Sequence, residues 1–252
     1  MADLGADPKA AYGAVYSPSF LSLFYDKYVL GFNMKYVWRC STRDVLLPFF
    51  AENFSRNHLD CGVATGWFPA AALARPFRAG GSRQRLALLD LTAPPLRAAA
   101  ARVRSVAAAA EVLCVEADVT QPPPERLRLM MSSSSSSPGG GRFDSISMFN
   151  LLHCMPGGRA KLRAFGCYKE LLADDGVLAG CTVLGPNERT GRLARLQLLW
   201  YNKWWGVFNN WDDTEEDIRE ALEREFAEVE TWVVGQVMLF RAKKPRKPLL
   251  DV

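Results

Sequence analysis

The feature that most constrains the fold is an alternation of short apolar runs with helical stretches. Helical patterns such as those at residues 95–110 and 158–172 separate most of the apolar runs, which predicts a mostly parallel sheet with helices on both faces. The last two runs are separated only by Gly235, so they cannot be joined by a crossover and should form an antiparallel hairpin. We therefore predict an α/β fold with a doubly wound, seven-stranded, mostly parallel sheet that ends in a hairpin. The predicted strands are residues 59–61, 86–91, 111–119, 142–150, 177–184, 229–234 and 236–242.

Composition and charge narrow the class of protein. The 252 residues are 49% hydrophobic and 23% charged, which is typical of a globular protein with a sizeable core. The net charge is only +4 and no basic cluster appears, so nucleic-acid binding is not expected. No apolar stretch approaches the ~20 residues of a membrane span, and the first residues do not resemble a signal peptide. A cytoplasmic protein is the default expectation.

The six cysteines are scattered along the chain. They form no C-x-x-C pair, and no histidine lies at a metal-ligand spacing from them, so neither a disulfide framework nor a metal site is expected. We interpret them as small buried hydrophobic residues. They are Cys40, Cys61, Cys114, Cys154, Cys167 and Cys181.

Three segments depart from the alternating pattern. Residues 1–44 are predicted to form an N-terminal helical cap on a main domain of residues 45–252. Residues 131–142 contain six serines followed by proline and glycines, which cannot bury apolar area and predict a flexible insertion. Residues 186–213 hold four of the seven tryptophans within twelve residues and are predicted to form a lid that walls a pocket for an apolar or aromatic molecule. Alternatively, these tryptophans pack a lid helix onto the core or form a homodimer interface.

Aromatic residues at helical spacing in the N-terminal segment could form the opposite wall of such a pocket. Core packing is the alternative that we favour for most of them. They are Tyr16, Phe20, Phe24, Tyr28 and Phe32.

A glycine-rich turn follows the first predicted strand. Gly62 and Gly66 at a strand-to-helix turn let the backbone approach a ligand without an intervening Cβ, although an ordinary turn would also explain them. The dinucleotide fingerprint G-x-G-x-x-G is incomplete, because position 64 is alanine and the third glycine is missing. This disfavours an NAD(P)-linked oxidoreductase.

Acids stand at the ends of three successive predicted strands, at Asp60, Asp90 and Asp118. The carboxyl ends of parallel strands line one crevice, where open α/β sheets bind ligands. Asp90 has the spacing from the glycine turn at which an acid accepts hydrogen bonds from ribose hydroxyls, and Asp118 could reach an adenine amino group. Alternatively, Asp60 caps the following helix and the other two are turn acids.

In this ordered set of motifs, the chain resembles the class I S-adenosylmethionine-dependent methyltransferases that act on small molecules, over about residues 45–244. The resemblance implies a Rossmann-like sheet and S-adenosylmethionine as the cofactor. Ala64 departs from the family pattern, which usually has glycine there. The residues to which the resemblance gives a cofactor-binding role are Tyr25, Arg39, Asp60, Gly62, Ala64, Gly66, Asp90, Leu91, Asp118, Val119 and Asn150.

The N-terminal part is similar to a narrower group. Tyr25-Asp26 followed by Trp38-Arg39 resembles the N-terminal helices of quinone-biosynthesis C-methyltransferases, with two residues fewer between the landmarks. This similarity implies that Arg39 helps to anchor the carboxylate of the cofactor or an acid beside it. A surface cation is the alternative.

Methyl transfer is an in-line displacement at a sulfonium carbon, so the protein mainly aligns the nucleophile and excludes water. Of the two histidines, His153 follows the fourth predicted strand and could be a general base, although this position often only packs beside the cofactor. We expect methyl transfer to an O, S, N or C atom of a hydrophobic or aromatic small molecule. The alternatives are a related fold that has been repurposed for non-methylating catalysis or binding and, less favoured, the oxidoreductase.

Overall fold

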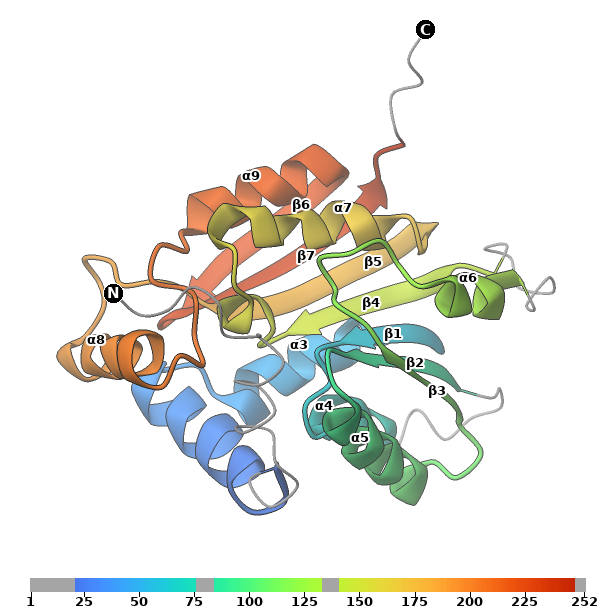
Figure 1. Ribbon diagram of the computed structural model, residues 1–252, viewed down its shortest axis with the longest axis horizontal. Coiled ribbons are helices and arrows are strands. Elements are labelled where there is room, and N and C mark those ends of the chain that lie inside the picture. Colours follow the sequence, from blue (N-terminus) through green and yellow to red (C-terminus); the bar gives the residue numbers. More distant parts are fainter. Residues whose placement is uncertain (1–20, 76–83, 133–140, 248–252) are drawn as a thin grey trace, which may run out of the picture.

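The predicted sheet is present in the computed structural model, which describes residues 21–75, 84–132 and 141–247 (Figure 1). Its seven strands run in the order β3-β2-β1-β4-β5-β7-β6; β1 to β5 are parallel, and β7 is antiparallel to both β5 and β6. The chain order thus reverses between β1 and β4, which is the point where doubly wound sheets bind ligands. The strands are β1 Asn57–Cys61, β2 Arg85–Asp90, β3 Glu111–Glu116, β4 Phe143–Phe149, β5 Leu172–Val183, β6 Phe226–Val234 and β7 Val237–Pro245.

Helices cover both faces of the sheet, with α7 and α9 above it and α4 and α5 below it in the view of Figure 1. Each face has its own hydrophobic core. In β2, Leu86 and Leu88 belong to one core, whereas Ala87 and Leu89 belong to the other. A strand buried on both faces needs a continuous apolar run of this kind. These four helices are α4 Trp67–Leu73, α5 Ala93–Val106, α7 Ala164–Lys169 and α9 Glu215–Glu225.

Two further groups of helices complete the lower core. The helical segments η1 Leu21–Val37 and η2 Thr42–Leu46 precede α3 Leu47–Glu52, and α8 Arg192–Leu199 continues directly into η6 Trp200–Trp204. Residues of η1, α3 and α8 share one hydrophobic cluster with α4 and α5. The predicted division at residues 44 and 45 therefore falls inside η2, within a continuous core.

The structure differs from the predicted elements in the middle of the chain. The single helix expected at residues 158–172 is a short segment, η5 Gly158–Arg163, followed by α7. Residues 174–176, which precede the predicted fifth strand, belong to β5, whose pairing with β4 shifts between Phe143 and Ser145. A helix that was not predicted, α6 Glu125–Ser132, follows three prolines, and most of the predicted insertion (residues 133–140) lies outside the described residues.

The six cysteines are all free. Cys40, Cys61 and Cys181 are buried, and the other three are half-buried, in line with the predicted role as small hydrophobic residues. Within the described ranges, none of the helices is both long and apolar enough to cross a bilayer.

Gly180 shows how tightly the centre of the sheet is packed. It pairs with Met148 of β4 and with Phe240 of β7, and a Cβ at this position would overlap both the Met148 carbonyl and the Phe240 ring. We expect Gly180→Ala to lower the free energy of unfolding by about 1–3 kcal/mol, as overpacking of a core does. Denaturant unfolding would measure this change.

Gly31→Ala is the matched control. Gly31 lies in η1, where an added Cβ makes only an ordinary contact of 3.4 Å with the Asp26 carbonyl. Alanine favours a helix more than glycine does, so this variant should be as stable as the parent or slightly more stable. Equal stability of the two variants would contradict the packing that we describe at Gly180.

Candidate functional site

A cavity of about 310 Å³ lies at the carboxyl ends of β1, β2, β3 and β4. It is bounded by the turn after β1, by the residues that end β2 and follow β3, and by the segment after β4. Eight of the eleven residues predicted to bind a cofactor line it. They are Tyr25, Gly62, Ala64, Asp90, Leu91, Asp118, Val119 and Asn150. We call it the cofactor cavity.

The turn after β1 adopts left-handed backbone conformations at alternate residues. The φ angles are 76° at Gly62, 45° at Ala64 and 67° at Gly66. A Cβ on Gly62 would lie 2.7 Å from Leu151 Cδ1, and a Cβ on Gly66 would lie 2.6 Å from the Cα of Ala99 in α5. Gly66 thus serves helix packing, while Gly62 borders the cavity. Ala64 adopts a conformation that costs an L-residue about 1–2 kcal/mol, which explains why glycine is usual there.

The two acids that line the cavity differ in their surroundings. Asp90 accepts a hydrogen bond from the Thr92 N–H (3.4 Å), and burial raises its pKa to about 6, although nearby backbone N–H groups act in the opposite direction. Asp118 is exposed, and its Oδ1 accepts hydrogen bonds from the N–H (2.8 Å) and the hydroxyl (2.7 Å) of Thr120. Asp118 is therefore a turn acid that also borders the cavity.

Asp60, the third predicted acid, does not line the cofactor cavity. It is buried and lines an adjoining narrow cavity that shares Tyr25, Gly62, Ala64 and Asn150 with the larger one. The structure therefore brings two of the three predicted carboxylates to one cavity and places the third in the adjoining space.

The contacts of Asp60 explain this position. The Ser147 hydroxyl donates to the Asp60 carboxylate (2.5 Å), and Ser147 Oγ in turn lies 2.8 Å from Nε2 of the buried His58. Nδ1 of His58 lies 2.6 Å from Ser145 Oγ. Burial raises the pKa of Asp60 to about 7, and this effect outweighs the opposing effect of the Ser147 hydrogen bond.

A second, apolar cavity adjoins the cofactor cavity and shares Tyr25, Asn150 and Cys154 with it. We call it the aromatic cavity. Its walls include Trp38 from the N-terminal part and several residues from the predicted lid, which are Tyr201, Trp205, Val207 and Phe208. The Trp38 and Phe208 rings lie 6.0 Å apart, and the Tyr201 and Phe208 rings lie 4.8 Å apart. Residues far apart in the sequence thus build one apolar space of about 60 Å³ that adjoins the cofactor cavity.

Asn33 and His153 are among the polar side chains that border this aromatic cavity. Asn33 is buried and donates from Nδ2 to the Tyr201 hydroxyl (2.7 Å), while its Oδ1 has no hydrogen-bond partner among the described residues. His153 is buried, and its ring lies 4.3 Å from that of Phe208. Nδ1 of His153 accepts a hydrogen bond from the Val183 N–H (3.2 Å) and lies 3.3 Å from Thr182 Oγ1.

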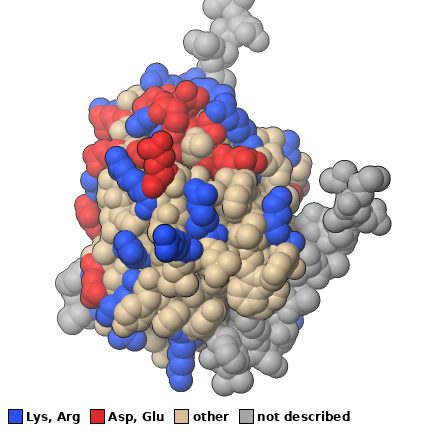
Figure 2. Space-filling view, turned by 90° about the vertical axis from the view of Figure 1, so that its left-hand side faces the viewer, with Lys and Arg blue, Asp and Glu red and all other residues tan. Residues whose placement is uncertain are grey.

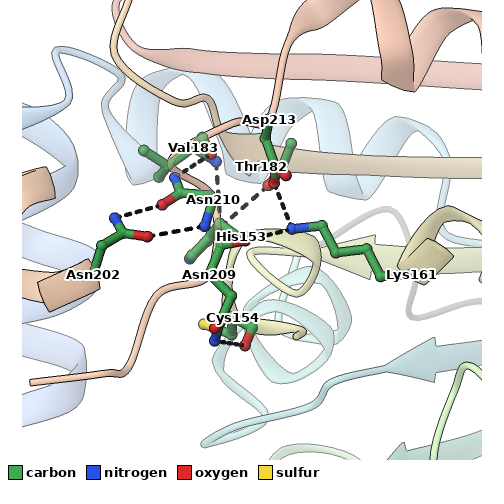
Figure 3. Close-up of polar contacts among 9 residues, drawn as sticks. All are labelled: His153, Cys154, Lys161, Thr182, Val183, Asn202, Asn209, Asn210 and Asp213. Carbon is green, nitrogen blue, oxygen red and sulfur yellow. Dashed lines mark hydrogen bonds and ion pairs between the residues drawn. The ribbon is translucent and has the colours of Figure 1, made fainter. Parts of the chain in front are cut away.

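A buried ion pair fixes the lid segment beside His153 (Figure 3). Lys161 Nζ donates to the Asp213 carboxylate (2.6 Å) and to the Asn209 carbonyl (2.9 Å). The Asn209 N–H in turn donates to the His153 carbonyl (2.7 Å). Burial and the charge of Lys161 lower the pKa of His153 to about 3, so its imidazole is neutral at physiological pH.

This geometry agrees with comparisons to known proteins. The chain is 55% identical over 249 residues to "O-methyltransferase NEC2" of Pyricularia oryzae, covering 94% of each chain. It is 36% identical to "Physcion biosynthesis cluster O-methyltransferase" of Aspergillus chevalieri, covering 92% of this chain and 95% of that protein. The chain belongs to the class I S-adenosylmethionine-dependent methyltransferases.

Solved structures agree on the fold. The N-methyltransferase NodS from Bradyrhizobium japonicum, in complex with S-adenosyl-L-homocysteine, superposes with a TM-score of 0.50 at 16% identity, covering 80% of this chain and 85% of NodS. No family model matches the sequence. The predicted methyltransferase family, fold and enzyme class are confirmed, and neither the oxidoreductase nor the repurposed fold is favoured. The narrower similarity to quinone-biosynthesis enzymes stays a prediction.

In this methyltransferase, Arg39 does not reach the cofactor cavity. It lines a separate cavity with Arg189, Gly191 and Gln236. The reason is that residues 38 and 39 pack against the β6–β7 turn, where the Gln236 N–H donates to the Trp38 carbonyl (2.8 Å). The prediction that Arg39 anchors the cofactor or a neighbouring acid therefore finds no support in this geometry.

A cation next to the glycine turn is Arg102 of α5, which the sequence analysis missed. Arg102 Nη2 pairs with Asp26 Oδ2 (2.6 Å), and Nη1 donates to Thr65 Oγ1 (2.9 Å). Thr65 also donates to Asp26 Oδ1 (2.7 Å), so this cluster ties η1 to the glycine turn. Asp26 follows Tyr25, so the sequence already drew attention to this acid. Nothing in the local pattern of α5 indicated that Arg102 is its partner.

Only some of the aromatic residues of the two predicted walls line the aromatic cavity. Leu196 and Trp204 of the lid are 64% and 81% exposed and line none of the cavities described above. Tyr28 and Phe32 are also exposed, so the core packing that we favoured for them is wrong. Tyr16, Phe20 and the side chain of Phe24 lie outside the described residues.

The buried Asp60 predicts a specific pH dependence of stability. Its native pKa of about 7 lies above the unfolded value of ~3.9, so its favourable contribution is complete below about pH 4 and is lost as the pH rises through 7. Asp60→Asn keeps an acceptor for Ser147 but cannot ionise. Between pH 4 and pH 8, the stability of this variant relative to the parent should increase by roughly 2–4 kcal/mol.

Urea unfolding of both proteins across this pH range would measure the difference. The control is Asp175→Asn, because Asp175 is exposed on β5, and its relative stability should change little with pH. A relative stability of Asp60→Asn that is independent of pH would show that Asp60 does not titrate in this range.

Proposed function

We propose that this methyltransferase transfers the methyl group of S-adenosylmethionine to a phenolic hydroxyl of a hydrophobic aromatic small molecule. The observation that carries the proposal is the aromatic cavity, which adjoins the cofactor cavity at Asn150, Tyr25 and Cys154. An aromatic ring held there would present a substituent to a ligand in the neighbouring cavity. The relatives named above, which are O-methyltransferases, support an oxygen acceptor.

The residues around the cofactor cavity fit S-adenosylmethionine, whose sulfonium would supply an activated methyl group. Asp90 would accept hydrogen bonds from ribose hydroxyls, and the backbone at Gly62 would allow close approach of the ligand. Asn150 Nδ2 is buried without a hydrogen-bond partner in the described part of the chain, so it would donate to the ligand where the two cavities meet. Leu91, Asp118 and Val119 would border the adenine.

The cofactor assignment has a direct test. We expect Asp90→Ala to weaken the binding of S-adenosylhomocysteine roughly tenfold, because hydrogen bonds to the ribose are lost. Titration calorimetry would measure the affinity, with Asp175→Ala as an exposed carboxylate control that should bind like the parent. Unchanged affinity in Asp90→Ala would show that the ribose contact is misassigned.

The activity itself would be tested with labelled S-adenosylmethionine and a panel of phenols and naphthols, with anilines and thiols of matched shape as comparison acceptors. We expect labelled methyl ethers from the phenols and naphthols. Transfer only to nitrogen or sulfur would contradict the proposed acceptor.

His153 would act as a hydrogen-bond donor rather than as a general base. Because the Val183 N–H donates to Nδ1, the proton of the neutral imidazole lies on Nε2. Nε2 makes no hydrogen bond to any residue in the described ranges, and the ring lines the aromatic cavity. This nitrogen could donate to an acceptor oxygen but could not remove its proton. The phenol would lose that proton to water, and the phenolate oxygen would then form the new bond to carbon as the bond from carbon to sulfur breaks.

This role predicts how the rate depends on pH. With two naphthols that differ in acidity through a ring substituent, the rise of kcat/KM with pH should follow the pKa of each naphthol. His153→Phe, which keeps a ring but no donor, should lower kcat roughly tenfold to a hundredfold, because a hydrogen bond to a charged oxygen is worth about 1.5–3 kcal/mol.

The same pH profile should persist in His153→Phe, and His153→Gln, which keeps an N–H donor, should lie between this variant and the parent. A pH profile in the parent that is independent of the naphthol and is lost in His153→Phe would instead identify His153 as a base.

Asn33 would accept a hydrogen bond from the substrate, whereas His153 would donate one. The buried Oδ1 of Asn33 would accept a hydrogen bond from a second hydroxyl of the aromatic molecule. We therefore favour an acceptor with at least two hydroxyl groups. A homodimer, a cytoplasmic location and the absence of nucleic-acid partners stay predictions of the sequence.

A further inference from the structure

The side of the molecule formed by η1 and α8–η6 is unusually apolar for a surface. These elements contact each other and lie side by side at the left of Figure 1. The exposed fractions are 49% for Phe32, 58% for Tyr36, 57% for Leu193, 64% for Leu196 and 81% for Trp204. Large exposed apolar patches mark interaction sites. We call this surface the aromatic–basic face.

Basic side chains are interspersed with these apolar ones. Lys35, Arg192, Arg195 and Lys203 are exposed on the same helices, and none of the four forms an ion pair with a residue that the structure describes. No acid occurs within Arg192–Trp204, and the single acid of η1, Asp26, is paired with Arg102. Figure 2 shows this side as a broad uncharged surface with separate blue residues, while red residues gather toward the top.

The combination of aromatic and unpaired basic residues fits one kind of partner. Trp, Tyr and Phe prefer the boundary between acyl chains and headgroups, and Lys and Arg are attracted to anionic lipids. The self-complementary interface of a twofold dimer is less compatible, because it would bring these unpaired cations close to their own copies. We infer that the aromatic–basic face binds the surface of an anionic lipid bilayer.

The aromatic–basic face lies next to the aromatic cavity, so binding of this face to a bilayer would bring the cavity close to molecules that are dissolved in the bilayer. The buried sides of the same elements supply Asn33, Met34 and Tyr201 to the cavity wall. A hydrophobic acceptor dissolved in a bilayer would therefore lie on the outer side of the wall that encloses its binding site. The face itself is independent of the proposed phenol chemistry.

Vesicle flotation with the full-length protein tests the inference. We expect the protein to float with vesicles of phosphatidylserine and phosphatidylcholine, and to remain unbound with phosphatidylcholine alone or at high salt. The double variant Arg192→Glu, Arg195→Glu should bind the anionic vesicles more weakly by roughly tenfold or more, since each cation near a charged membrane contributes about 1 kcal/mol. Leu196→Ser combined with Trp204→Ser should also reduce binding.

Matched controls come from α6, which lies at the other side of the molecule in Figure 1. Arg126→Glu and Leu129→Ser change an exposed cation and an apolar side chain that is 60% exposed, and both should float like the parent. Thermal unfolding of every variant would separate loss of binding from loss of fold. Equal flotation of face and control variants would overturn the inference.

Light scattering supplies a second criterion. A dimeric mass for the parent that becomes monomeric in Leu196→Ser, Trp204→Ser would mean that a second copy covers the face, and would also overturn the inference. If the variant has the same mass as the parent but no longer floats with the vesicles, the result supports bilayer binding.

Discussion

Because the sheet is buried on both faces, its strands can offer polar side chains to a ligand only where they end. The two hydrophobic cores occupy the two flanks of β2 and β4, and helices close over both. The glycine turn, Asp90 and Asn150 therefore gather at one edge of the sheet, where the order of the strands reverses. Asp60 shows what happens to an acid that lies within a strand. Its carboxylate is buried in β1 and is hydrogen-bonded by the Ser147 hydroxyl.

The two cavities of the site have different structural origins. The cofactor cavity is built mainly from residues that directly follow strands, so each contribution is set by local geometry. The aromatic cavity combines residues of η1, the segment after β4 and the lid, which are distant in the sequence. Buried polar contacts such as Lys161 with Asp213 hold these segments together, and breaking such a pair leaves an uncompensated charge.

The sequence was sufficient for the sheet, the hairpin and most of the cofactor cavity, since apolar runs and strand ends are local features. It failed where a residue's role depends on a distant partner. Arg39 follows Trp38 in a motif, but the hydrogen bond between Trp38 and the β6–β7 turn places Arg39 outside the cofactor cavity. Arg102 was missed because its partners, Asp26 and Thr65, lie 76 and 37 residues away. The sequence also could not show that the Val183 N–H donates a hydrogen bond to Nδ1 of His153, a contact that bears on the hypothesis of a general base.

The anchoring of residues 209–213 also couples the lid to the segment that carries His153. Asn210 donates to the Val183 carbonyl (2.8 Å) and exchanges hydrogen bonds with Asn202, while Asp213 is held by Lys161. Asn202 belongs to η6, so these hydrogen bonds join the helical part of the lid to the segment whose Asn209 N–H donates to the His153 carbonyl. The aromatic wall at Tyr201 and the imidazole of His153 are therefore parts of one hydrogen-bonded unit, and a substitution that displaces one of them would also displace the other.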